Sequence, residues 1–484
     1  MLGILSITLT LAAGVLVALA FDPVRGMRPR WAAVLFTACL GILAGAAADS
    51  IVFLILAVGG IASAIAVFVS DAILLCAAVA LYVRTKRTAT AAAIPSPAPF
   101  RYTWLLVVVF AVTLLIVAGR LAAMTEANPW GGWDALAMWN LRAKFLAGAP
   151  GDWHYAVNGA LADRMHPDYP LLLPSLVAAG WKAGGEMDTL VPVFVSFLFW
   201  GVLIALLVSA VAMLRGAASA LLSGLVILAT TSFLLLAPSQ YADIPLACYW
   251  LGAVALLLIG GEASRTAAVW AGVCAGYGAW TKNEGIAFLA WFVLALLVLF
   301  WWKRGRRAAM RQTVFVLAGA IPGILLTLWL KFVVAPPADT LVRQSQGAML
   351  AKITDAGRYV EIAKSFIDAV LHLGMGVGHP LILLAILAVV LRWNPGRTYR
   401  PAMAVSAAAL GLMFLADIGA YLITPSDLNW QLGTSFDRLI LQLWPSTLLV
   451  CFAAMGSLAD NSRPTTETHS ARPPQAARAK KKRK

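Results

Sequence analysis

The sequence predicts an all-α protein, a polytopic transmembrane bundle of about 13 helices with the N-terminus outside and the C-terminus in the cytoplasm. Hydrophobic residues make up 61% of the 484 residues, and charged residues only 12%. Apolar stretches that reach the ~20 residues needed to cross a bilayer recur along the whole chain. Lys and Arg occur in short clusters between these stretches, as in cytoplasmic loops. The net charge of +15 therefore indicates topology, and no nucleic-acid partner is expected.

Residues 1–92 are predicted to form an N-terminal transmembrane unit of about three helices. The apolar stretch at 2–20 precedes a cluster of arginines, so the loop after it is expected in the cytoplasm. This stretch lacks the cationic residues that open a secretory signal, and it is expected to stay uncleaved. The apolar run at 31–83 is too long for one crossing and is predicted to break near Gly59-Gly60.

A proline-spaced segment at 93–102 is expected to be a linker, because proline cannot continue a helix. The core follows at 103–458. Its first span crosses outward, which leaves the long segment 124–189 outside the cytoplasm. Residues 459–484 are expected to form a disordered basic cytoplasmic tail that lies against anionic membrane lipid. The core is predicted to contain further spans near residues 190–214, 217–237, 244–260, 267–280, 285–302, 314–334, 377–391, 402–423 and 439–458.

The extracytoplasmic segment 124–189 is predicted to contain interfacial helices. It is rich in tryptophan and tyrosine, which favour the headgroup level of a membrane. Within 134–146 the apolar side chains fall on one helical face, and Asp134 lies on the opposite, wetter face. The apolar face consists of Leu136, Trp139, Ala143 and Leu146.

Several polar side chains occur at the extracytoplasmic ends of the predicted helices. Asp134 is either a functional carboxylate or a helix cap. Asp243 is either functional or a carboxylate stabilised by the dipole of the helix that it opens. Lys282 either binds a negative group or forms a structural ion pair with Glu284. Arg438 either recognises phosphate or extends its side chain to the membrane surface.

Three short motifs lie on this same side of the membrane. They are Asp134 in the first large extracytoplasmic loop, the string Asp243-Ile244-Pro245-Leu246-Ala247, and the string Thr281-Lys282-Asn283-Glu284-Gly285. In type, order and spacing they resemble motifs of the GT-C superfamily of polyprenyl-phosphate-sugar glycosyltransferases. The resemblance covers residues 103–458 and is strongest to bacterial protein O-mannosyltransferases and lipid A aminoarabinose transferases.

The resemblance implies an inverting glycosyltransferase of the bacterial inner (plasma) membrane, with an extracytoplasmic active site. It would move a sugar from a polyprenyl-phosphate donor to a hydroxyl of a lipid-linked glycan, lipid or protein acceptor. Asp134 matches the catalytic base and Asp243 the second acidic position, while Lys282 matches a basic residue that faces the leaving phosphate. Arg438 and Arg343 are further candidates for binding the donor phosphate. The other expected pocket residues are His166, Asp168, Tyr169, Glu284 and His379.

Metal binding and two other functions stay open. Divalent metal binding by His166 and Asp168 is undecided, because one His and one Asp two residues apart do not make up a site. The first alternative function is a glycan ligase or polymerase with a diphosphate-linked donor. The second is a secondary transporter or flippase. A carrier usually has ionisable residues near the midplane, where this sequence is nearly bare of charge except for Asp71 and Asp417.

Overall fold

The computed structural model is all-α. Within the described residues there is no β-strand, and one isolated bridge joins Trp393 and Met455. In the described part of the chain, ten helices are long and apolar enough to cross a membrane, which confirms the predicted polytopic helical bundle. The described residues are 1–85, 99–161, 165–261, 264–336, 344–396 and 399–458.

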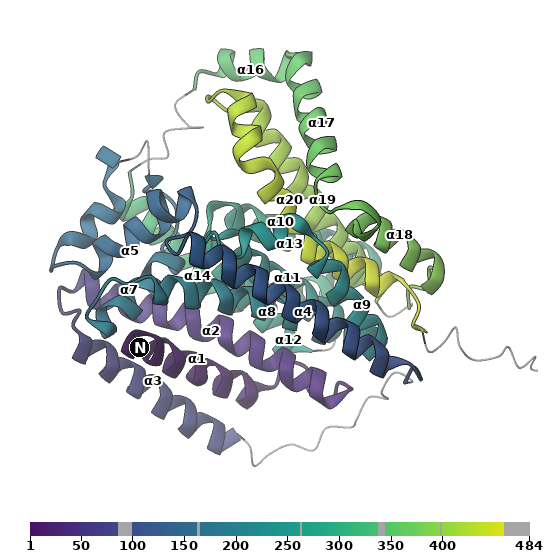
Figure 1. Cartoon of the computed structure of the whole chain (residues 1–484), viewed down its shortest axis with the longest axis horizontal. Helices are drawn as coiled ribbons and strands as arrows, with labels where there is room; N and C mark the ends of the chain where they lie inside the picture. Colours follow the sequence, from purple (N-terminus) through teal and green to yellow (C-terminus); the bar gives the residue numbers. More distant parts are fainter. Residues whose placement is uncertain (86–98, 162–164, 262–263, 337–343, 397–398, 459–484) are drawn as a thin grey trace, which may run out of the picture.

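The helices follow one another along the chain as Figure 1 shows. The N-terminal half contains α1 (Leu2–Phe21), α2 (Arg30–Val58), α3 (Ala64–Thr85), α4 (Thr103–Ala127), α5 (Asn140–Ala147), α7 (Leu172–Gly184), α8 (Leu190–Arg215), α9 (Ala217–Leu228) and α10 (Thr231–Leu236). The C-terminal half contains α11 (Asp243–Gly260), α12 (Arg265–Thr281), α13 (Asn283–Arg304), α14 (Arg306–Trp329), α16 (Gln346–Thr354), α17 (Ala356–Leu371), α18 (Pro380–Leu391), α19 (Arg400–Ile423) and α20 (Leu428–Ala454). Short stretches of π- or 3₁₀-helix are η2 (Ala135–Trp139), η3 (Asp152–Val157), η4 (Gly159–Leu161), η5 (Leu330–Val334) and η6 (Gly376–Gly378).

Three of the expected crossings correspond to helices shorter than a full span. α9 and α18 have 12 residues each, and α12 has 17. At a rise of about 1.5 Å per residue, a 12-residue helix covers only about 18 Å of the ~30 Å hydrocarbon core. α9 ends at Leu228, and α10 begins after Thr230, whose hydroxyl accepts a hydrogen bond from Trp444 Nε1 at 3.0 Å. This part of the bundle is therefore filled by broken helices and not by one continuous crossing.

The N-terminal helices α1, α2 and α3 pack against the core (Figure 1). α1 and α2 approach closely because both carry glycine at the contact. A Cβ atom on Gly14 would lie 2.2 Å from the carbonyl oxygen of Gly41. α2 is tied to α11 by Tyr249, whose hydroxyl donates to the Leu43 carbonyl at 2.9 Å. Most of the predicted linker falls on residues 86–98, which lie outside the described part of the chain.

The segment predicted as a surface helix at 134–146 is a π-helical turn, η2, followed by α5. Trp139, Ala143 and Leu146 are buried on one face, as expected. Leu136 differs, because its side chain is 51% exposed. A π turn is wider than an α turn, so it changes the angular position of Leu136 relative to the residues that follow it.

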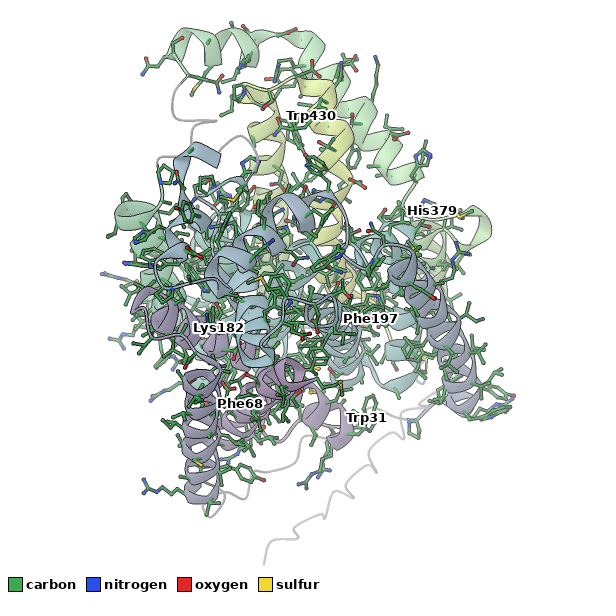
Figure 2. All side chains as sticks on the ribbon, turned by 60° about the vertical axis from the view of Figure 1, so that its left-hand side comes forward. Trp31, Phe68, Lys182, Phe197, His379 and Trp430 are labelled. Carbon is green, nitrogen blue, oxygen red and sulfur yellow. The ribbon has the colours of Figure 1, made fainter. Side chains whose placement is uncertain are left out.

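Helices α16 and α17 and the adjoining ends of α19 and α20 form one end of the molecule. α16 and α17 lie beyond the main bundle, beside α19 and α20 (Figure 1). Arg358 Nη2 of α17 donates to the Tyr421 carbonyl at 2.8 Å, and Ile362 packs in a small apolar cluster with Phe436. Trp430, near the start of α20, marks this end, and Trp31, in the first turn of α2, lies at the opposite end (Figure 2).

Among the residues described, three spans contain a buried carboxylate away from their first turn. Asp71 in α3 and Asp417 in α19 are 1% and 7% exposed. Asp49 in α2 is 2% exposed and was missed by the sequence analysis. Ser6 Oγ donates to Asp71 Oδ2 at 2.5 Å, whereas Asp49 Oδ2 has no hydrogen-bond partner among the described residues. The helix centres therefore carry one more ionisable group than the sequence analysis expected.

The alternation of basic loops makes a prediction about sidedness. A cysteine in place of Asn158 should react with an impermeant maleimide added outside intact cells, because Asn158 is exposed in the expected extracytoplasmic segment. A cysteine in place of Arg307, exposed at the start of α14, should react only after the membrane is permeabilised. Labelling of the unsubstituted protein measures the background from the native cysteines. Labelling of Arg307→Cys in intact cells would reverse the assigned topology.

Candidate functional site

Asp243 is the centre of a buried polar cluster at the start of α11. Its side chain is 1% exposed. Oδ1 accepts hydrogen bonds from Lys282 Nζ at 3.0 Å and Gln442 Nε2 at 2.5 Å. Oδ2 accepts from Arg438, with Nε at 3.2 Å and Nη2 at 2.8 Å. Because both oxygens are already occupied by donors, Asp243 is an anchor for the surrounding cations.

Arg438 joins the two carboxylates that the sequence analysis proposed as catalytic. Its Nη1 lies 2.7 Å from Asp134 Oδ2, while Nη2 holds Asp243. The guanidinium also stacks over the ring of Tyr241, 4.4 Å from the ring centroid. The Asp134 side chain is 22% exposed, so it is the carboxylate of this pair that a substrate can reach.

The two glycines before Asp134 allow this loop to approach α11. Gly131 has a φ of 79°, a conformation that favours glycine. Gly132 donates its backbone N–H to the Ser239 carbonyl at 3.0 Å, and a Cβ there would lie 2.4 Å from the Tyr241 hydroxyl. Asp134 itself makes no capping hydrogen bond to the turn that follows it. Its side chain is therefore directed to Arg438 and not to the backbone.

Lys282 lies at the junction of α12 and α13, in extended conformation. Its Nζ contacts Glu284 Oε1 at 2.8 Å in addition to Asp243, so the ion pair considered as the alternative for Lys282 is present. Burial opposes the charged form of Lys282, but the two carboxylates outweigh burial and raise its pKa. Glu284 Oε2 is buried and has no hydrogen-bond partner among the described residues.

A second polar cluster adjoins the first through Asn283. Asp168 Oδ2 accepts hydrogen bonds from Asn283 Nδ2 at 2.8 Å and from Lys331 Nζ at 2.9 Å. Burial opposes ionisation of Asp168, but Lys331 and Asn283 outweigh it and hold the pKa of this carboxyl below its usual range. Lys331 was missed from the sequence. The sequence feature that could have identified Lys331 is its position at the expected extracytoplasmic end of a span, where the positive-inside pattern places few cations.

The loop that carries His166, Asp168 and Tyr169 is held by Arg142 of α5. Arg142 is fully buried, and it too was missed from the sequence. Its Nε donates to the Ala156 carbonyl at 2.8 Å, and its Nη2 donates to the carbonyls of Pro167 at 3.3 Å and Tyr169 at 2.8 Å. This arginine connects three backbone segments within residues 142–169.

Replacing Arg142 should destabilise this region strongly. Arg142→Met leaves three carbonyl oxygens without their donor, and each buried unpaired group costs about 1–3 kcal/mol. We expect a lower melting temperature of the purified protein in detergent. Lys144→Met is the matched control, because Lys144 lies on the same helix and is exposed. Equal melting temperatures for Arg142→Met and the unsubstituted protein would refute this role.

The remaining predicted site residues are distributed as follows. His166 is exposed, and its ring centroid lies 5.5 Å from that of Tyr169. Burial raises the pKa of Tyr169, whose ring packs against Trp139. His379 lies apart from the cluster, on the α17–α18 corner (Figure 2). Its Nδ1 accepts from the Leu381 N–H and its Nε2 contacts the Val370 carbonyl, so it caps α18. Arg343 lies outside the described residues.

No group of three or more His, Cys, Asp and Glu side chains that could hold a metal ion occurs among the residues described. The Asp168 carboxylate is occupied by Lys331 and Asn283, and His166 makes its ring contact with Tyr169. No protein-family model, curated protein or solved structure matches this chain.

Proposed function

We propose that this multi-pass membrane protein is an inverting glycosyltransferase that uses a polyprenyl-phosphate sugar. The observation that carries the proposal is the pairing of Asp134 and Asp243 through Arg438, with Lys282 on the far side of Asp243. It offers an accessible carboxylate next to a fixed cation. Sugar transfer from a lipid phosphate needs these two groups, because a proton is removed from the acceptor while negative charge develops on the leaving phosphate.

The residues would divide the work as follows. Asp134 takes the proton of the acceptor hydroxyl as its oxygen attacks the anomeric carbon from the face opposite the phosphate. The bond between the anomeric carbon and the phosphate oxygen breaks, and the lipid phosphate leaves with the electron pair. Arg438 faces the developing charge. Asp243 keeps Arg438 in place and does not act as a base, since its oxygens are occupied.

The charge balance of the cluster suggests how the donor activates Asp134. Asp134, Asp243 and Glu284 carry three negative charges against two positive charges on Lys282 and Arg438. A donor phosphate therefore competes with Asp134 for Arg438. Binding of the donor releases Asp134 from its ion pair, and the carboxylate becomes free to accept a proton from the acceptor.

The transporter alternative has an observation of its own in its favour. Asp49, Asp71 and Asp417 are buried within spans, and such groups are often part of ion pathways. They lie in three different helices, and Asp417 is close enough to Glu284 and Lys282 to interact with them electrostatically. If the protein is a transporter, Asp417→Asn should lose substrate uptake. If it is a glycosyltransferase, Asp49→Asn should keep donor binding.

The location and acceptor are part of the same proposal. We place the cluster at the extracytoplasmic face of a bacterial inner membrane, with a lipid-linked glycan, lipid or protein as acceptor. The basic tail at 459–484, expected to contact anionic lipid, lies outside the described residues.

The proposal is tested by lipid binding to purified protein. Polyprenyl monophosphate should bind, and Arg438→Gln should weaken this binding by about tenfold or more, because a charge-assisted contact to phosphate is lost. Arg120→Gln is the matched control, since Arg120 is an exposed arginine in the second half of α4, toward the expected extracytoplasmic side. Tighter binding of the diphosphate than of the monophosphate would favour the ligase or polymerase alternative. Equal binding by Arg438→Gln would contradict the site.

A further inference from the structure

A cavity of about 380 Å³ lies at the other end of the N-terminal helices. It is bounded by the last turn of α1, the first turns of α2 and the last turn of α3. The opposite end of α1 packs on α7, where a Cβ on Gly3 would lie 2.2 Å from the Gly180 carbonyl oxygen. Trp31, next to the cavity residue Arg30, marks this end of the molecule (Figure 2). The cavity is thus separate from the Asp134 cluster and lies at the expected cytoplasmic side.

The lining of the cavity is positively charged. Arg25, Arg28 and Arg30 line it together with one acidic residue, Asp22, among the described residues. Arg25 pairs loosely with Asp22, at 4.0 Å with both side chains substantially exposed. Arg28 and Arg30 form neither a hydrogen bond nor an ion pair with any residue that the structure describes. Two arginines are therefore available for a negatively charged ligand.

A threonine in the lining gives a further indication of a ligand. Thr37 lines the cavity two helical turns along α2 from Arg30, and it is only 2% exposed. No hydrogen bond joins its hydroxyl to another residue in the described part of the chain. A threonine in a helix usually bonds to a carbonyl of the preceding turn or to water, so an unpaired hydroxyl here suits an acceptor oxygen of a ligand.

The lining also has an apolar side. Leu19, Ala20 and Val34 line it, and Val34 is 49% exposed on the outer surface of α2. Phe21 and Trp31 beside the cavity are also about half exposed, at 51% and 48%. A small free anion would make no contact with these apolar surfaces. A lipid would place its phosphate among the arginines and its chains along the exposed apolar side.

We propose that this cavity binds the phosphate group of a membrane lipid headgroup. Its volume falls in the range of ligand pockets, about 300–1,000 Å³. Arg28 and Arg30 hold the phosphate oxygens, Thr37 donates its hydroxyl, and the start of α2 adds the positive end of a helix dipole. This site does not depend on the proposed glycosyl transfer, since it uses none of the same residues.

The test is titration of the purified full chain with dioctanoyl phosphatidic acid, followed by native mass spectrometry. Removing two charge-assisted contacts in Arg28→Gln/Arg30→Gln should weaken binding at least about tenfold. Thr37→Val should weaken it less, and Asp22→Asn should strengthen it by removing the one acidic group of the described lining. Arg84→Gln is the matched control, because Arg84 is exposed in the same last turn of α3 but does not line the cavity.

Two further probes identify the source of the phosphate. Dioctanoylglycerol, which lacks the phosphate, should not bind, and inorganic phosphate should bind far more weakly than the lipid. Inorganic phosphate binding as tightly as phosphatidic acid would overturn a lipid site and leave a site for small anions. An equal loss in Arg84→Gln and in the double variant would overturn the cavity altogether, because binding would then follow surface charge.

Discussion

Asp134→Asn should fold, bind the lipid donor and turn over about 10²–10⁴-fold more slowly than the unsubstituted protein. Asparagine has nearly the shape of aspartate but cannot accept the acceptor's proton. It also removes the competitor for Arg438, so donor binding should be unchanged or tighter. The measurement is single-turnover transfer of a labelled sugar at saturating donor and acceptor, together with donor affinity.

Glu126→Gln provides the control for this substitution. Glu126 is an exposed carboxylate near the end of α4, on the expected extracytoplasmic side, and its loss should leave turnover unchanged. If Asp134→Asn keeps most of its turnover, the accessible carboxylate is not the base. If it loses donor binding in parallel with turnover, Asp134 has a structural part in the donor site.

Lys282→Met should lower the free energy of unfolding by about 3–5 kcal/mol, because it removes one partner from a buried ion network. Lys282 is 6% exposed in its side chain and contacts both Asp243 and Glu284. Asp243 keeps Arg438 and Gln442, so the charge left without a partner is that of Glu284. Melting temperature in detergent reports this change.

The double variant Lys282→Met/Glu284→Gln distinguishes a structural role of Lys282 from a role in binding the donor phosphate. Removing both charges should restore most of the lost stability, with a coupling energy of about 0.5–3 kcal/mol. If Lys282 also faces the donor phosphate, the double variant stays weak in polyprenyl-phosphate binding although it is stable. Restored stability together with normal lipid binding would leave Lys282 with a structural role alone.

The sequence predicted the helical membrane fold well because its signal is local. Long apolar runs and intervening cations suffice to identify a span, and ten of the predicted spans are long apolar helices. The errors lie where local pattern is insufficient. At the break between α9 and α10, Thr230 accepts a hydrogen bond from Trp444, and at Leu136 the exposure coincides with a π turn. Hydrophobic periodicity predicts neither this contact nor this turn.

The residues of the candidate site could be predicted from the sequence better than the contacts between them. The sequence placed Asp134, Asp243, Lys282 and Arg438 on one side of the membrane. It did not indicate that Arg438 would bridge Asp134 and Asp243, since these pairs are hundreds of residues apart. Arg142 was not among the predicted residues, because only the folded loop shows the three carbonyls that it binds.

The central claim is that Asp134 serves sugar transfer from a polyprenyl phosphate. It is tested most directly by incubating purified protein with radiolabelled polyprenyl-phosphate sugars and membrane extract, and by following the label. The account predicts that the label leaves the lipid donor and appears in a new product with the unsubstituted protein, and that Asp134→Asn does not support this transfer. Label that stays on the donor for every sugar tested, with protein that is folded by its melting curve, would contradict the account.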